Sequence, residues 1–63
     1  MRFLLQLTAA VLLAAIYARG NAYRLQDDYV RAIANYDEAI RLNPPFEAAL
    51  VNRGNSYLYR PVS

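Results

Sequence analysis

The chemistry that this chain could do rests mainly on carboxylates and tyrosines, because its 63 residues include no His, Cys or Lys. The usual general bases and activated nucleophiles are therefore missing. Four of the five acidic residues form two adjacent pairs, Asp27-Asp28 and Asp37-Glu38. Neighbours in a helix point in different directions, so neither pair converges on one metal ion. We expect no catalytic residue, no metal site and no cofactor, and therefore no enzyme.

Residue types suited to binding are more plentiful. Six tyrosines offer a large contact area with few rotatable bonds, and asparagine side chains both donate and accept hydrogen bonds. The seven arginines are scattered along the chain and leave a net charge of +2, which does not favour nucleic acid. The expected partner is therefore a protein or a peptide.

A repeat in the sequence indicates which helices would position these residues. The phrase AAIYARGNAY at residues 14–23 returns 34 residues later as AALVNRGNSY at residues 48–57. Ala, Ala, Arg, Gly, Asn and Tyr recur in register. A fixed period of this size is typical of stacked helical hairpins, in which each unit buries its apolar face only against its neighbours.

One amphipathic segment lies between the two phrases. Its apolar positions follow the spacing of one helix face: Tyr29, Ala32, Ile33, Tyr36, Ala39 and Ile40. Its opposite face carries Arg31, Asn35, Asp37, Glu38 and Arg41. We interpret these polar residues as solvated surface, with weak ion pairs from Asp27 to Arg31 and from Asp37 to Arg41.

This pattern resembles the tetratricopeptide repeat family. The positions that match the family signature are Gly20, Tyr23, Ala32, Tyr36, Ala39 and Pro44, followed in a second copy by Gly54 and Tyr57. The resemblance implies an all-α fold of helical hairpins, here with three helices, the first long and apolar. It divides the chain into an apolar helical extension at 1–12, one complete repeat at 13–46, the first helix of a second repeat at 47–59 and a tail at 60–63.

The resemblance also implies a binding surface. In this family the first helices of successive repeats line a concave groove that receives a peptide. The residues that this places in the groove are Tyr17, Asn21, Arg24, Asn52, Asn55 and Tyr59. The asparagines resemble those that such grooves use on a peptide backbone, although they also suit a plain solvated face. The family's basic clamp is missing, which argues against capture of an acidic C-terminal tail.

Breaks in the pattern predict the helix ends. The first helix is expected to run without interruption from about Phe3 to Leu25. A turn at residues 26–28 follows, with Asp27 in the left-handed conformation and Asp28 as the N-cap of the second helix. The proline pair at 44–45 ends that helix, and Pro45 is expected in the first turn of the third helix, from about Phe46 to Tyr59.

The two glycines are expected to allow close packing between helices. Gly20 should lie against the small Ala32 of the second helix, and Gly54 should serve the same purpose in the next copy. The face formed by Leu50, Gly54 and Tyr57 is expected to be either exposed or covered by a neighbour.

The N-terminal run of sixteen uncharged residues, 3–18, leaves three interpretations open. It could be a signal peptide or short membrane anchor, a helix packed on a partner or a second copy, or ordinary core. About twenty apolar residues are needed to cross a bilayer, so the run is short for a span. Under the first interpretation the protein would be membrane-associated or exported.

These observations favour a non-enzymatic subunit for protein–protein interaction or assembly. One alternative is a membrane-associated accessory protein anchored by its first helix. The other is a repeat fragment that self-associates as an oligomer.

Overall fold

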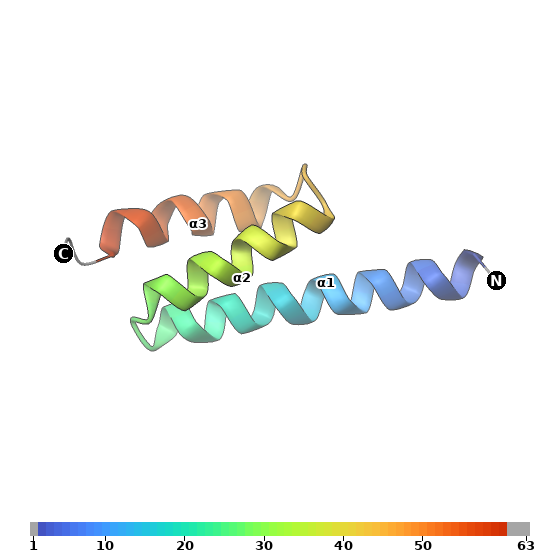
Figure 1. Cartoon of the computed structure of the whole chain (residues 1–63), viewed down its shortest axis with the longest axis horizontal. Helices are drawn as coiled ribbons and strands as arrows, with labels where there is room; N and C mark the ends of the chain where they lie inside the picture. Colours follow the sequence, from blue (N-terminus) through green and yellow to red (C-terminus); the bar gives the residue numbers. More distant parts are fainter. Residues whose placement is uncertain (1, 61–63) are drawn as a thin grey trace.

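The computed structural model describes residues 2–60, and the side chains of residues 8–60. It consists of α1 (Arg2–Leu25), α2 (Tyr29–Leu42) and α3 (Glu47–Tyr59), with no strand among the described residues. Successive helices run antiparallel, and α2 lies between α1 and α3 (Figure 1). The all-α, three-helix prediction is confirmed. Of the tail predicted at 60–63, residues 61–63 lie outside the described part.

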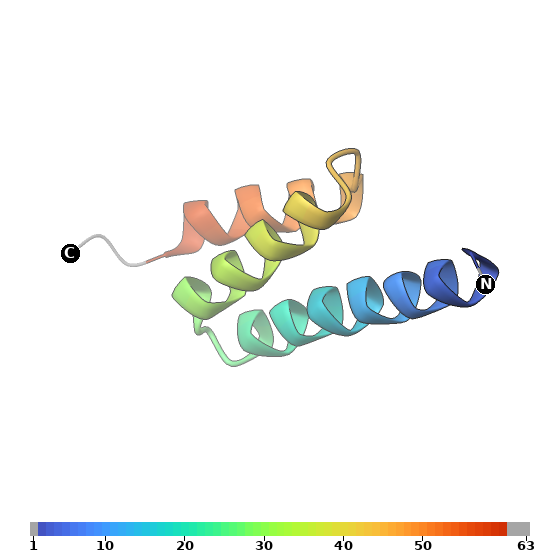
Figure 2. The ribbon, with the colours of Figure 1, turned by 45° about the vertical axis from the view of Figure 1, so that its right-hand side comes forward.

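The first helix is much longer than the other two. Its 24 residues span about 36 Å, so its N-terminal half extends past the end of α2 (Figure 2). Val11 and Leu12 on this extension are exposed. Side chains of residues 3–7, part of the predicted apolar run, lie outside the described part. Within residues 2–60, no helix is long and apolar enough to cross a membrane.

A Schellman motif ends α1. The backbone N–H of Asp28 donates to the Tyr23 carbonyl at 2.9 Å, and that of Asp27 donates to the Arg24 carbonyl at 3.0 Å. Asp27 has a φ of 60°, in the left-handed region, and Asp28 caps α2 by accepting from the Arg31 N–H at 3.2 Å. Both predictions for this turn are confirmed.

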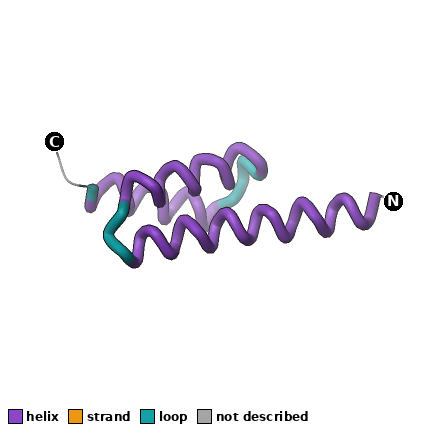
Figure 3. The backbone as a smooth tube through the Cα atoms, turned by 60° about the horizontal axis from the view of Figure 1, so that its bottom comes forward, coloured by secondary structure: helices purple, strands orange, loops and turns teal. Residues whose placement is uncertain are grey.

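The second turn differs from the prediction. The Phe46 N–H donates to the Asn43 carbonyl at 3.0 Å, which closes a four-residue turn with the two prolines at its centre. Pro45 therefore lies in this turn, and the prediction that it belongs to the first turn of α3 is wrong. Phe46 is the N-cap residue, and α3 begins at Glu47. Figure 3 shows both connections as short loops between the helices.

The core is a thin layer on both sides of α2. The buried cluster consists of Ile16, Ala32, Tyr36, Ala39 and Ala49, with Ile33 and Ser56 also buried. The predicted apolar face of α2 thus forms the centre of the molecule. On α3 the buried residues are both small, Ala49 and Ser56.

Gly20 packs tightly, and its nearest neighbours are Tyr36 and Asn35 instead of the predicted Ala32. A Cβ built at Gly20 would lie 2.8 Å from Cε1 of Tyr36 and 3.3 Å from Cβ of Asn35, and Ala32 is not among the nearest residues. The aromatic ring one turn further along α2 occupies the space instead. Gly54 has no such neighbour, since nothing lies within 4 Å of a Cβ built there. The packing role predicted for Gly54 is absent among the described residues.

The ion pairs also differ from those predicted. Arg31 pairs with Asp28 at 3.5 Å and Arg41 with Glu38 at 2.5 Å, both three residues apart. Asp37 pairs with Arg53 of α3 at 2.8 Å, so it links two helices instead of staying on the surface of one. The expected i, i+4 pairs were wrong because the left-handed turn moves Asp27 off the helix and Asp37 faces α3.

Asn35 is the other exception on the polar face of α2. It is buried, accepts a hydrogen bond from Nε of Arg19 at 2.6 Å and donates to the Arg31 carbonyl at 2.8 Å. The prediction that it is a solvated residue is wrong, since the close contact at Gly20 brings α1 over it.

Candidate functional site

A polar network joins α1 to α3 across α2. Nδ2 of Asn52 on α3 donates to the Tyr17 hydroxyl at 2.7 Å and to Oδ1 of Asn21 at 3.1 Å, both on α1. The same Asn21 oxygen accepts a hydrogen bond from the hydroxyl of Tyr36 on α2. One amide oxygen therefore connects all three helices.

Aromatic packing supports this network. The ring centroid of Tyr17 lies 4.9 Å from that of Phe46 and 5.8 Å from that of Tyr36, both in tilted arrangements that aromatic pairs prefer. Tyr17 is half-buried as a result.

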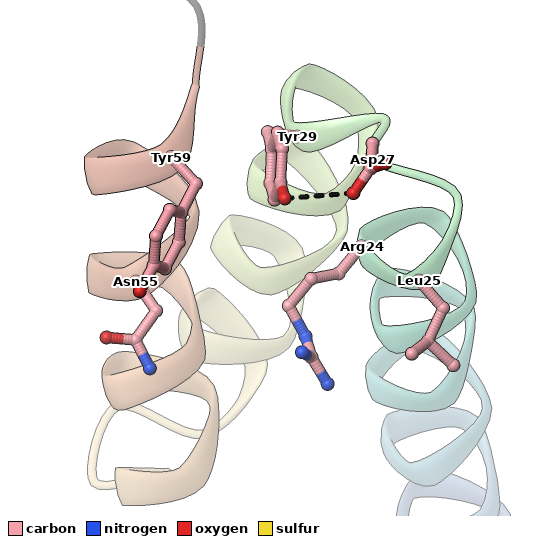
Figure 4. Close-up of a pocket in the computed structure, with 6 residues that line it drawn as sticks. All are labelled: Arg24, Leu25, Asp27, Tyr29, Asn55 and Tyr59. Carbon is pink, nitrogen blue, oxygen red and sulfur yellow. Dashed lines mark hydrogen bonds between the residues drawn. The ribbon is translucent and has the colours of Figure 1, made fainter.

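Beyond the network the same surface opens into a pocket of about 310 Å³. It is bounded by the last turn of α1, the first turn of α2 and the last two turns of α3 (Figure 4). The lining residues are Arg24, Leu25, Asp27, Tyr29, Asn55 and Tyr59. Figure 4 shows the Arg24 side chain reaching into the space between α1 and α3.

Two hydrogen-bond donors of the pocket are available to a ligand. Nε of Arg24 makes one long hydrogen bond, 3.4 Å, to the Tyr36 hydroxyl, and its guanidinium has no ion pair within residues 8–60. The Asn55 side chain is exposed and has no hydrogen-bond partner in the same range. The pocket thus presents an amide with no hydrogen-bond partner within residues 8–60 and a guanidinium whose one internal hydrogen bond is long.

Two of the other lining residues are tyrosines. The ring of Tyr59 lies 6.3 Å from that of Tyr29, centroid to centroid. The Tyr29 hydroxyl donates to Oδ1 of Asp27 at 3.0 Å, and this hydrogen bond to a carboxylate raises the pKa of Tyr29 above its ordinary value. The Asp27 carboxylate is therefore already engaged by a neutral phenol. Asp27 and Arg24 carry charges of opposite sign on the same pocket, but they form no ion pair within residues 8–60.

The structure divides the six residues that were predicted to line a groove into two groups. Tyr17, Asn21 and Asn52 make internal hydrogen bonds, whereas Arg24, Asn55 and Tyr59 line the pocket. The sequence did not identify Leu25, Asp27 and Tyr29 as lining residues. A left-handed residue at the end of α1 is the signal that could have found them, because it turns α2 back over that end.

A second hollow lies at the other end of the molecule. Ala9, Ala10, Leu12 and Leu13 of α1 and Leu42 and Asn43 at the end of α2 surround about 280 Å³, mostly with apolar atoms. The extension of α1 therefore has one side that faces the end of α2 across this hollow and another side that is exposed.

Comparison with known proteins agrees with this geometry. A family model for the TPR repeat matches residues 20–58, which is more than half of the chain. The chain belongs to the TPR repeat family. TPR repeats generally mediate protein–protein interaction or assembly, and the family is typically non-enzymatic. Searches of curated proteins and of solved structures found no match.

The TPR match begins at Gly20, which packs tightly against Tyr36, and ends one residue before the last residue of α3. It therefore includes the network residues Asn21 and Asn52 and most of the pocket. Within residues 8–60, no group of three or more His, Cys, Asp or Glu side chains could hold a metal ion.

Proposed function

We propose that this TPR chain is a non-enzymatic interaction or assembly subunit that binds a protein or peptide segment on the surface between α1 and α3. The pocket is the centre of this surface. The observation that carries the proposal is a pair of donors at the pocket: within residues 8–60 the Asn55 amide has no hydrogen-bond partner, and the Arg24 guanidinium has one long hydrogen bond and no ion pair.

The two groups of residues have different tasks in this proposal. Tyr17, Asn21 and Asn52 hold α1 and α3 at a fixed separation, because each is tied into hydrogen bonds between the helices. A surface held in place in this way loses little conformational entropy when a partner binds. Arg24, Asn55 and Tyr59 make the contacts.

The pocket selects the chemistry of the partner. The Arg24 guanidinium suits an oxygen acceptor, either a main-chain carbonyl or a side-chain carboxylate. The Asn55 amide can donate to and accept from a peptide backbone at once. Tyr59, 69% exposed, offers a flat face for an apolar or aromatic side chain. An extended segment with one acidic or polar residue next to an apolar one fits these three groups.

The test is selection of a peptide from a displayed random library with the 63-residue chain as bait. The dissociation constant of the selected peptide is then measured by calorimetry. Arg24→Gln should weaken binding at least about tenfold, since a hydrogen bond to a charged group contributes roughly 1.5–3 kcal/mol. Asn55→Ala and Tyr59→Ala should weaken it as well, with helicity unchanged.

Arg41→Gln is the matched control. Arg41 lies on α2, away from the pocket, and its side chain is 67% exposed in an ion pair with Glu38. Its loss should leave peptide affinity unchanged. The proposal fails if no peptide is selected, or if the selected peptide binds Arg24→Gln and Tyr59→Ala as tightly as the unaltered chain.

A further inference from the structure

One face of α3, which carries Leu50 and Tyr57, is left partly exposed by residues 8–60. Glu47, Leu50, Gly54 and Tyr57 recur at intervals of three and four residues, which places them in a line along one side of the helix. We call this line the α3 seam. Leu50 is 38% and Tyr57 49% exposed, and nothing lies within 4 Å of a Cβ built at Gly54. None of the four lines the pocket.

An equivalent face on α1 is covered by another helix. Ile16, Gly20 and Tyr23 stand 34 residues before Leu50, Gly54 and Tyr57 and occupy the same positions in α1. There Ile16 is buried and Gly20 receives the ring of a tyrosine from α2. The α3 seam therefore has the form of a helix-binding face, with its glycine uncovered.

The charges at the two ends of the seam are opposite. Glu47, in the first turn of α3, has no ion pair within residues 8–60. At the other end the guanidinium of Arg60 lies over the ring of Tyr57, 5.4 Å from its centroid. A second α3 placed antiparallel to the first would bring each Glu47 next to an Arg60. A parallel arrangement would place like charges together.

We propose that two copies of this chain form a dimer through their α3 seams, antiparallel about a two-fold axis close to Gly54. In this register Leu50 lies opposite Tyr57 of the second copy, and the two glycines meet where the helices cross. Glu47 lies opposite Arg60 of the second copy. The face is self-complementary, as a two-fold interface requires, in its apolar contacts, its small residues and its charges.

The dimer and the peptide surface are independent of each other. The dimer uses the seam, and the peptide uses the pocket lined by Arg24, Asn55 and Tyr59. Failure of either proposal therefore leaves the other to be judged by its own experiment.

The test is sedimentation equilibrium of the 63-residue chain over a wide concentration range. The unaltered chain should change from monomer to dimer. Glu47→Arg places two arginines opposite each other at both ends, and Arg60→Glu places two glutamates there, so each variant alone should dimerise at least about tenfold more weakly. An equimolar mixture of the two variants should form a heterodimer, because both ends then pair opposite charges.

Two further variants separate the seam from general effects. Glu38→Arg makes the same change in net charge as Glu47→Arg on the exposed side of α2, and it should leave dimerisation unchanged. Gly54→Leu should keep the helix content measured by circular dichroism, since the site is open in the monomer, yet abolish the dimer by separating the crossing helices.

Several results would overturn the proposal. They are a chain that stays monomeric at every concentration, a dimer that Gly54→Leu does not disturb, and a Glu47→Arg variant that dimerises more strongly, which would indicate parallel helices. Failure of the mixed variants to prefer each other would also overturn it.

Discussion

Gly20 and Gly54 occupy the same position in the two copies of the repeat, and exchanging each for alanine should affect stability differently. At Gly20 the new methyl carbon would lie 2.8 Å from Cε1 and 3.0 Å from Cδ1 of Tyr36. That ring is fully buried, and its hydroxyl is held by Asn21 and Arg24. The ring therefore cannot move aside cheaply. At Gly54 the methyl carbon would meet nothing within 4 Å.

The magnitudes follow from two terms. Alanine is favoured over glycine inside a helix by about 1 kcal/mol, and this gain applies at both positions. At Gly20 overpacking of a filled core opposes it with a cost of roughly 1–3 kcal/mol. Gly54→Ala should therefore stabilise the monomer by about 1 kcal/mol, whereas Gly20→Ala should give a net change from about zero to a loss of about 2 kcal/mol. The difference between the two variants is then about 1–3 kcal/mol.

The measurement is urea unfolding followed by circular dichroism at 222 nm, at a protein concentration low enough for the chain to be monomeric. A domain of this size buries a small core, so a shift of 1 kcal/mol is a large fraction of its stability. The reasoning is refuted if both variants shift the midpoint in the same direction by the same amount, because the contact at Gly20 would then have no energetic consequence.

Three other substitutions test single contacts. Asp28→Ala removes the side-chain acceptor at the start of α2 and should cost about 1 kcal/mol in the same unfolding experiment. Tyr36→Phe takes a donor from Asn21 in the interior and should cost roughly 1–3 kcal/mol, whereas no change would mean that the network is not formed. Hydrogen bonding to Arg41 lowers the pKa of Glu38, so this pair stabilises the fold above the ordinary glutamate pKa and loses its effect as the pH falls through the lowered value. In the Glu38→Gln variant, the free energy of unfolding should therefore fall less as the pH is lowered through this range.

The fold could be predicted because its main determinants are local. The left-handed turn at Asp27 and the cap at Asp28 each depend on a few neighbouring residues, and both are confirmed by the structure. The apolar face of α2 could be predicted for the same reason, since helical periodicity alone places Ala32, Tyr36 and Ala39 together.

Contacts between helices could not be predicted in the same way. Which residue fills the space at Gly20 depends on the relative shift of α1 and α2, and a shift of one turn exchanges Ala32 for Tyr36. The pairing of Asp37 with Arg53 depends likewise on where α3 lies beside α2. Helical spacing gives the face on which a residue lies but not the partner that reaches it.

The same limit explains the two groups of groove residues, and it makes their roles separable by experiment. Asn21 and Asn52 have their polar atoms engaged inside the molecule, so removing either amide leaves a partner unsatisfied and should lower the free energy of unfolding. Arg24 makes one long internal hydrogen bond and Asn55 none among the described residues, so their loss should reduce binding with little change in stability. Sequence position alone treats these four residues as equivalent. The hydrogen bonds distinguish residues that hold the helices together from residues whose polar groups are available at the surface.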